Sequence, residues 1–177
     1  MSILKIARMG HPVLRAKARP VEKTELKGAV VQKLIDDMID TMIEYHGVGL
    51  AAPQVHEGLR IFVAAVDPAG DGHEDDDTKP IVLINPVITV AGGDIVEDWE
   101  GCLSVPDIRG RVPRAREIRL HALDRKGDRI EMSAHDFTAR VIQHEADHLD
   151  GLLFFDRMRS FGSLTFLDEF SRYCAKD

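Results

Sequence analysis

Cysteine is scarce in this chain. Its 177 residues include only Cys102 and Cys174, which are too few for the disulfide framework of a small secreted fold. Long hydrophobic runs are also missing, because no apolar stretch approaches the ~20 residues that cross a bilayer. Lys5 and Arg8 interrupt the first apolar residues, where a signal peptide would need its hydrophobic region. We therefore expect a soluble, cytoplasmic protein with no membrane partner.

An excess of positive charge is absent as well. The formal net charge is -7, so there is no electrostatic reason to expect sequence-independent binding to nucleic acid. Eight arginines and lysines occur between residues 109 and 129, but Glu117, Asp124 and Asp128 are interleaved with them. This mixture favours a solvated pair of strands over a nucleic-acid surface.

Two histidines four residues apart are the first indication of a metal-binding site. On a helix, His144 and His148 would project from one face with an axial offset of about 6 Å, which lets both bind one metal ion. Glu145 lies between them, close enough to take a proton from a water on that ion. A merely solvated histidine pair is the alternative, but the flanking apolar residues predict a buried stripe on this helix. Those residues are Phe137, Val141, Ile142, Leu149 and Leu152.

The periodicity of apolar residues predicts the remaining elements. It indicates a long helix over 24–46 that ends at Gly47, strands over 59–66 and 80–90, an acidic surface loop over 67–78, a hairpin of 117–123 with 129–135, a metal-binding helix over 136–149 and a short last helix over 163–173. These elements predict an α+β fold. We expect small, mostly antiparallel sheets packed around the central metal-binding helix, in one domain spanning residues 1–177.

The third metal ligand is less obvious. Catalytic sites of this kind take three protein ligands and leave a further position to water. No histidine follows His148, so the candidates are carboxylates such as Asp156, Asp168 and Glu169, or Cys102. A buried, unreactive thiol would be equally at home at position 102, and the residues alone leave this choice open.

Three sequence motifs, taken together, resemble those of a known protein family. The segments GVGLAAPQ (47–54), EGCLS (100–104) and QHEADH (143–148) resemble, in order, the three signature motifs of peptide deformylases. The similarity covers nearly the whole chain, and three linked motifs are far more specific than HExxH alone. One departure is Asp107, where many members carry glycine, so we expect an altered loop near the entrance of the site.

The resemblance implies a metal-dependent hydrolase that removes the formyl group from the N-terminal methionine of new polypeptides and releases formate. It implies Cys102, His144 and His148 as metal ligands. Glu145 would act as the base and then give its proton to the departing amine. The side-chain amide of Gln54 and the backbone N–H of Leu103 would stabilise the developing oxyanion.

The same resemblance guides the choice of substrate-binding residues. The missing side chain at Gly49 would let a peptide backbone pair beside Gly49 and Leu50. An apolar pocket for methionine would be lined by Val48, Phe137 and Val141, although core packing would explain these residues equally well. Arg109 would contact either the peptide carbonyls or only solvent.

The resemblance implies Fe²⁺ as the cofactor, while Zn²⁺, Ni²⁺ and Co²⁺ suit the same ligands. N-formylmethionyl nascent peptides would be the partners, with transient proximity to the ribosome. The chain ends soon after Tyr173, which predicts no ribosome-docking extension. A monomer is expected because no large apolar stripe is left over. The rival hypotheses are a zinc endopeptidase that does not use Cys102, and a non-catalytic metal-binding protein in which Glu145 is incidental.

Overall fold

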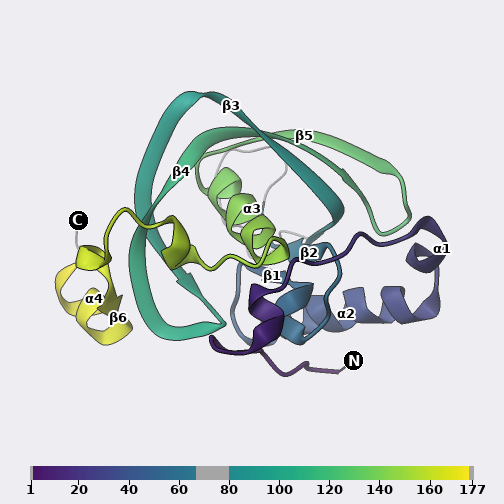
Figure 1. The fold of residues 1–177 in the computed structure, drawn as a ribbon, viewed down its shortest axis with the longest axis horizontal. Helices are drawn as coiled ribbons and strands as arrows, with labels where there is room; N and C mark the ends of the chain where they lie inside the picture. The colour runs from purple at the N-terminus through teal and green to yellow at the C-terminus, as the bar shows by residue number, and fades with distance from the viewer. Residues whose placement is uncertain (1, 67–79, 176–177) are drawn as a thin grey trace.

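A computed structural model describes residues 2–66 and 80–175 (Figure 1). It contains helices and an antiparallel sheet, which confirms the α+β class. The predicted small sheets are instead one sheet, with strand order β1-β2-β3-β4-β5 and with β6 paired to β4. The acidic loop predicted over 67–78 lies outside the described residues.

The strands differ greatly in length. Two of them, β3 and β4, form a long curved ribbon that dominates Figure 1. The bounds are β1 Gly49–Ala51, β2 Ile61–Ala64, β3 Ile81–Cys102, β4 Val105–Leu123, β5 Arg129–His135 and β6 Thr165–Phe166. The predicted strand over 80–90 is therefore too short. A register shift between Ala91 and Ile95 absorbs Gly92, whose φ is 72°, so pairing continues past a glycine pair that resembled a turn.

The helices also depart from the prediction at two places. The helix expected over 24–46 is divided into α1 (Lys23–Leu26) and α2 (Ala29–Glu44), because Gly28 has an extended backbone. The last helix, α4 (Leu167–Tyr173), is shorter than expected and follows β6. The HExxH segment lies in α3 (Asp136–Leu149). Within the described residues, no helix has the length and apolarity needed to span a membrane. Four short 3-10 helices complete the fold: η1 Pro12–Arg15, η2 Ala52–Val55, η3 Phe154–Arg157 and η4 Phe161–Ser163.

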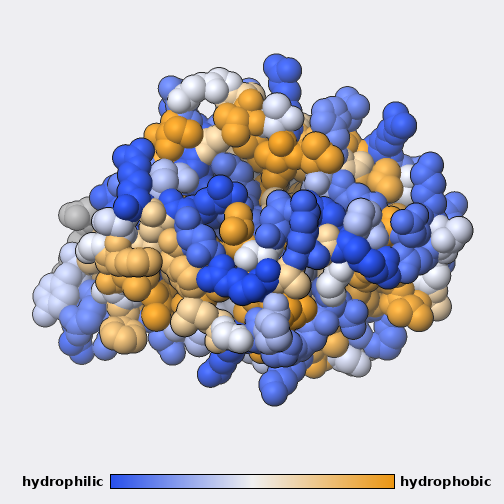
Figure 2. Space-filling view, in the orientation of Figure 1, coloured by the Kyte–Doolittle hydropathy of each residue, from blue (hydrophilic) through white to orange (hydrophobic). Residues whose placement is uncertain are grey.

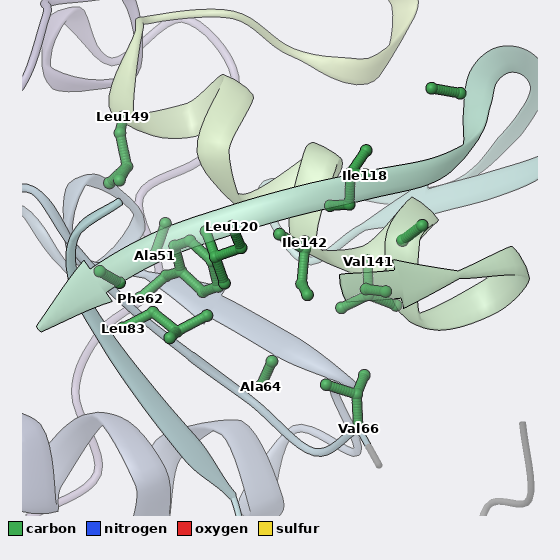
Figure 3. Close-up of a cluster of buried hydrophobic side chains, with 14 of the residues drawn as sticks. Ala51, Phe62, Ala64, Val66, Leu83, Ile118, Leu120, Val141, Ile142 and Leu149 are labelled. Atoms are coloured by element: carbon green, nitrogen blue, oxygen red, sulfur yellow. The ribbon is translucent and has the colours of Figure 1, made fainter. Parts of the chain in front are cut away.

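The first strands of the sheet are buried on both faces. Side chains alternate along a strand, so Phe62 and Ala64 face α3 while Ile61 and Val63 face α2. Figure 3 shows the cluster on the α3 side, where residues of α3 meet residues of β1, β2, β3 and β4. Its labelled members are Ala51, Phe62, Ala64, Val66, Leu83, Ile118, Leu120, Val141, Ile142 and Leu149. This packing fixes α3 against the sheet and so positions its histidines.

Candidate active site

Cys102, His144 and His148 come together in the structure. One possible ligand atom from each lies within 4.8 Å of the others, and Cys102 Sγ is 3.3 Å from His148 Nε2. Sulfur and nitrogen ligands on one tetrahedral ion, with bond lengths near 2.3 and 2.1 Å, stand about 3.6 Å apart. The donor set therefore fits a single divalent ion, and the carboxylates of Asp156, Asp168 and Glu169 are not part of this cluster.

The position of Cys102 follows from a tight turn. Cys102 ends β3 and pairs with Val105, so Leu103 and Ser104 form the connection to β4. This connection holds the sulfur beside α3, where His144 and His148 lie one turn apart on the same face. A local feature of the β3–β4 ribbon thus supplies one ligand, and a helix far along the sequence supplies two.

The electrostatics of the cluster favour a thiolate. Burial raises the pKa of the Cys102 thiol, but the positive charge of His148 and hydrogen bonds from both histidines outweigh it and hold that pKa well below its usual value. Burial lowers the pKa of His144, but its hydrogen bonds to Cys102 and Glu100 outweigh burial and raise that pKa well above its usual value. A thiolate is the form in which cysteine binds a metal.

Glu100 orients the first histidine. Its Oε2 accepts a hydrogen bond from His144 Nδ1 at 2.8 Å, which leaves Nε2 of that ring to face the cluster. Burial raises the pKa of Glu100, but hydrogen bonds from His144 and Arg114 outweigh burial and lower it to about 2. Arg114 and Arg140 both donate to this carboxylate. Partners of this kind typically fix the ring orientation of a metal-binding histidine.

Sequence reasoning missed this ionic network. Arg114 was expected on a solvated strand pair, but its side chain is 5% exposed and also donates to Asp147 on α3. Arg157 completes the network by donating to the same Asp147. A usable signal existed for Glu100, because residues two apart on a strand share a face, and Glu100 stands two before Cys102. No local pattern marks Arg114 as buried.

Glu145 lies beside the cluster in a buried position. Its side chain is buried, and among the described residues its Oε2 has no hydrogen-bond partner. Burial raises the pKa of Glu145, with the charges of His144 and His148 opposing this effect. A Cβ added at Gly49 would lie 2.7 Å from the Glu145 Cδ. The missing side chain at Gly49 therefore makes room for the Glu145 carboxylate. The sequence had instead suggested that it makes room for the substrate backbone.

Gln54 is held in one orientation. Its Oε1 accepts a hydrogen bond from Ala51 N at 2.8 Å, and its Nε2 donates to Ser104 Oγ at 3.3 Å and to Cys102 Sγ at 3.5 Å. The side chain is only 2% exposed. Its NH₂ group therefore faces the sulfur of Cys102.

A cleft of about 1100 Å³ opens over these residues. Most of the predicted substrate-binding residues line it, whereas the Leu50 side chain is fully buried in the core and does not. Phe137 was expected in the buried stripe of the helix, but it is 39% exposed at the cleft because it lies in the first turn of α3. The predicted substrate-binding residues that line the cleft are Val48, Gly49, Arg109, Phe137 and Val141, and Leu103 lines it as well.

Arg109 and Asp107 shape one side of the cleft. The Arg109 guanidinium lies over Gly101, where an added Cβ would be 2.7 Å from its Nε, and it donates to Ile108 O at 3.0 Å. Asp107 has a φ of 61°, in the left-handed region that glycine adopts most readily. This conformation accounts for the glycine expected at position 107 from the resemblance.

Comparison with known proteins gives one consistent result. A family model described as polypeptide deformylase matches residues 3–163. Peptide deformylase 2 from Nostoc is 46% identical over 158 residues, which cover 89% of this chain and 87% of that protein. A Met-Ala-Ser-bound class I type b peptide deformylase from Acinetobacter baumannii has a TM-score of 0.81 and 38% identity, covering 89% of this chain and 99% of that one. The Thermus thermophilus peptide deformylase has a TM-score of 0.77 and 44% identity, covering 88% and 86%.

Proposed function

The chain belongs to the polypeptide deformylase family and removes the formyl group from the N-terminal formylmethionine of new polypeptides; we propose that it does so in the cleft over Cys102, His144 and His148. The observation that carries this assignment is the convergence of these ligand atoms within 4.8 Å beside the buried carboxylate of Glu145. HExxH alone is a common pattern. A thiolate supplied by a distant turn makes the donor set much more specific.

The family is metal-dependent, and we propose Fe²⁺ as the ion that the three ligands bind in the cell. Thiolate and imidazole ligands also suit Zn²⁺, Ni²⁺ and Co²⁺, so the ligand set supports a divalent ion more strongly than it supports iron. When bound, the ion would polarise the formyl carbonyl and lower the pKa of a water molecule. A ferrous site with a thiolate ligand should lose activity on exposure to peroxide.

Glu145 is proposed to carry the proton. Its carboxylate is buried beside both histidines, and burial raises its pKa, which makes it a better proton acceptor than an exposed carboxylate. It would take a proton as the water attacks the formyl carbon and then give that proton to the departing methionine nitrogen. Formate and a free N-terminal amine result, so the carboxylate returns to its starting state.

Gln54 and Leu103 are proposed to stabilise the negative charge that develops on the formyl oxygen. The hydrogen bond from Ala51 N to Gln54 Oε1 turns the NH₂ group toward Cys102. Leu103 follows Cys102 directly, so its backbone N–H lies close to the sulfur. Loss of one such donor typically costs 10²- to 10³-fold in rate.

The substrate peptide is proposed to bind along β1, the first strand in the order of the sheet. Pairing with the backbone of Gly49 and Leu50 would add the peptide to this edge. Val48, Phe137 and Val141 would then surround the methionine side chain, and Arg109 would contact peptide carbonyls. The Met-Ala-Ser-bound deformylase from Acinetobacter baumannii supports a peptide of this kind as the ligand.

The substrate, a newly made polypeptide, suggests where in the cell the protein acts. We propose that residues 1–177 act as a single catalytic domain and as a monomer in the cytoplasm, close to ribosomes, where new formylated chains emerge. Gel filtration of the purified protein tests the monomer. Co-sedimentation with translating ribosomes, compared with empty ones, tests whether proximity depends on a nascent chain.

A formate-release assay with metal analysis tests the function. Anaerobically purified protein should contain about one iron per chain and release formate from formyl-Met-Ala-Ser. Cys102→Ser should lose both metal and activity, whereas Cys174→Ser should keep both. Metal and activity retained in Cys102→Ser would support the zinc endopeptidase, and equal formate release by wild type and Glu145→Ala would support a non-catalytic protein.

A further inference from the structure

The first residues of the chain are attached to α2. Ser2 N donates a hydrogen bond to Asp37 Oδ1 at 3.1 Å, and Leu4 N donates one to Thr41 Oγ1 at 2.9 Å. Both acceptors are buried residues of α2. Figure 1 shows the chain running from there to the tip of the β3–β4 ribbon. In the same view, Figure 2 shows hydrophilic and hydrophobic residues intermixed along this lower edge of the molecule. We call residues 2–9 the N-terminal strap.

The far end of the strap contacts both segments that carry the proposed oxyanion donors. Ala7 N donates a hydrogen bond to Gln54 O at 2.7 Å, and Met9 N donates one to Ser104 O at 2.8 Å. The Gln54 side chain in turn donates to Ser104 Oγ. Gln54 and Ser104 are buried, with exposed fractions of 2% and 0%. Two N–H groups of one short segment thus connect the backbones of two motifs that are distant in the sequence.

Met9 makes its attachment through the backbone. Its side chain is 54% exposed, so the contact with Ser104 depends on the main-chain N–H. His11 N donates to Arg8 O at 3.0 Å, which closes a four-residue turn with Met9 at the second place. Gly10, at the third place, has a φ of 103°. A positive φ there is typical of a type II turn. The conformation of this turn therefore decides where the Met9 donor meets the buried Ser104 carbonyl.

We propose that the N-terminal strap is a positioning element for the oxyanion donors. Through Ala7 and Met9 it holds the Gln54 side chain and the Leu103 N–H at the separation that the formyl oxygen requires. Ser104 follows Leu103 directly, so a shift of Ser104 also moves that donor. The inference rests on the proposed roles of Gln54 and Leu103. Donors of this kind act because they are placed before the reaction, and a misplacement of about 1 Å costs on the order of 10²-fold in rate.

Met9→Pro tests the strap by removing one N–H. Proline is favoured at the second place of a type II turn, so the substitution should keep the turn and delete only the donor to Ser104 O. With formyl-Met-Ala-Ser, kcat should fall about 10- to 100-fold. KM and metal content should stay near wild type, because the donor pair matters more for the transition state than for the bound substrate. Met9→Ala is the matched control: it keeps the N–H and should keep kcat.

Gly10→Ala tests the same attachment without proline. A Cβ at Gly10 meets nothing within 4 Å, so alanine introduces no clash and acts only by disfavouring the φ of 103°. It should lower kcat in the same direction as Met9→Pro, with KM little changed. Gly58→Ala is its control, since a Cβ there also meets nothing within 4 Å. Wild-type kcat in Gly10→Ala and in Met9→Pro would overturn the proposal, and Gly10→Ala alone decides it if Met9→Pro does not fold.

A double-mutant cycle shows whether the strap acts through the oxyanion donors. Because Met9→Pro and Gln54→Ala would impair the same group of donors, Met9→Pro should lower kcat by a smaller factor in Gln54→Ala than in wild type. Equal factors in the two backgrounds, or a rise in KM with kcat unchanged, would contradict the positioning role. A slow Gln54→Ala beside a wild-type Met9→Pro would overturn the strap alone. Wild-type kcat in Gln54→Ala would instead overturn the proposed role of Gln54, and the strap with it.

Discussion

Replacing Gly49 by alanine should lower the catalytic rate while leaving metal binding intact. The added Cβ would lie 2.7 Å from Cδ and 2.8 Å from Cγ of Glu145, whereas unstrained carbon contacts lie near 3.5–4.0 Å. The Glu145 side chain is buried and only 4% exposed, so it must shift by about 1 Å. Misplacement of a catalytic group by this much costs on the order of 10²-fold in rate.

The expected signature is a kcat reduced about 10²-fold with KM little changed. Metal content should stay at the wild-type level, because the three ligands are not displaced. Gly58→Ala is the matched control, since a Cβ there meets nothing within 4 Å, and it should keep both constants. If Gly49 serves only to admit the substrate backbone, KM would rise while kcat stayed near wild type. That result would refute the packing argument, as would full activity in Gly49→Ala.

Other substitutions separate proton transfer, ligand orientation and backbone conformation. Glu145→Gln should lower kcat by about 10²- to 10⁴-fold with metal content retained, as formate release and metal analysis would show; a rate near wild type would exclude Glu145 as the base. Glu100→Gln should weaken metal binding by about 10- to 100-fold in chelator competition, and an unchanged affinity would count against its orienting role. Gly151→Ala should lower the free energy of unfolding in urea by at least ~1–2 kcal/mol, because its φ is 75° and a Cβ would lie 2.6 Å from Arg15 O. Asp107→Gly should change that free energy by less than about 1 kcal/mol, whereas Asp107→Ala should lower it by about 1 kcal/mol or more; equal values for the two would remove φ as the reason for glycine at position 107.

The elements that were predictable from sequence depend on local patterns. The hairpin of 117–123 with 129–135 alternates apolar and polar residues, and β4 and β5 end and begin at the expected positions around its turn. The expected helix over 136–149 has the bounds of α3. Neither element needs information from distant residues, since a period of two or of 3.6 reports which face is buried.

The parts that sequence could not supply depend on distant partners. The long continuation of β3 past Gly92 requires β4 to pair with it, and local composition there resembles a turn. Arg114 is indistinguishable from its solvated neighbours until Glu100 and Asp147 are placed around it. The contact between Trp99 and Phe170 joins residues 71 positions apart. In each case the physical cause lies in another segment of the chain.

The register of β3 places Cys102, a proposed metal ligand, on the same face of the strand as Glu100, the carboxylate that orients His144. Glu100 and Cys102 alternate with Trp99 and Gly101, so the first pair faces α3 while Gly101 lies beneath Arg109. A slip of one residue in the β3–β4 pairing would turn both the thiolate and the carboxylate away from α3. The two-residue connection between Cys102 and Val105 opposes such a slip. The EGCLS motif therefore encodes a metal ligand, the carboxylate that orients His144, and the turn that holds both in place.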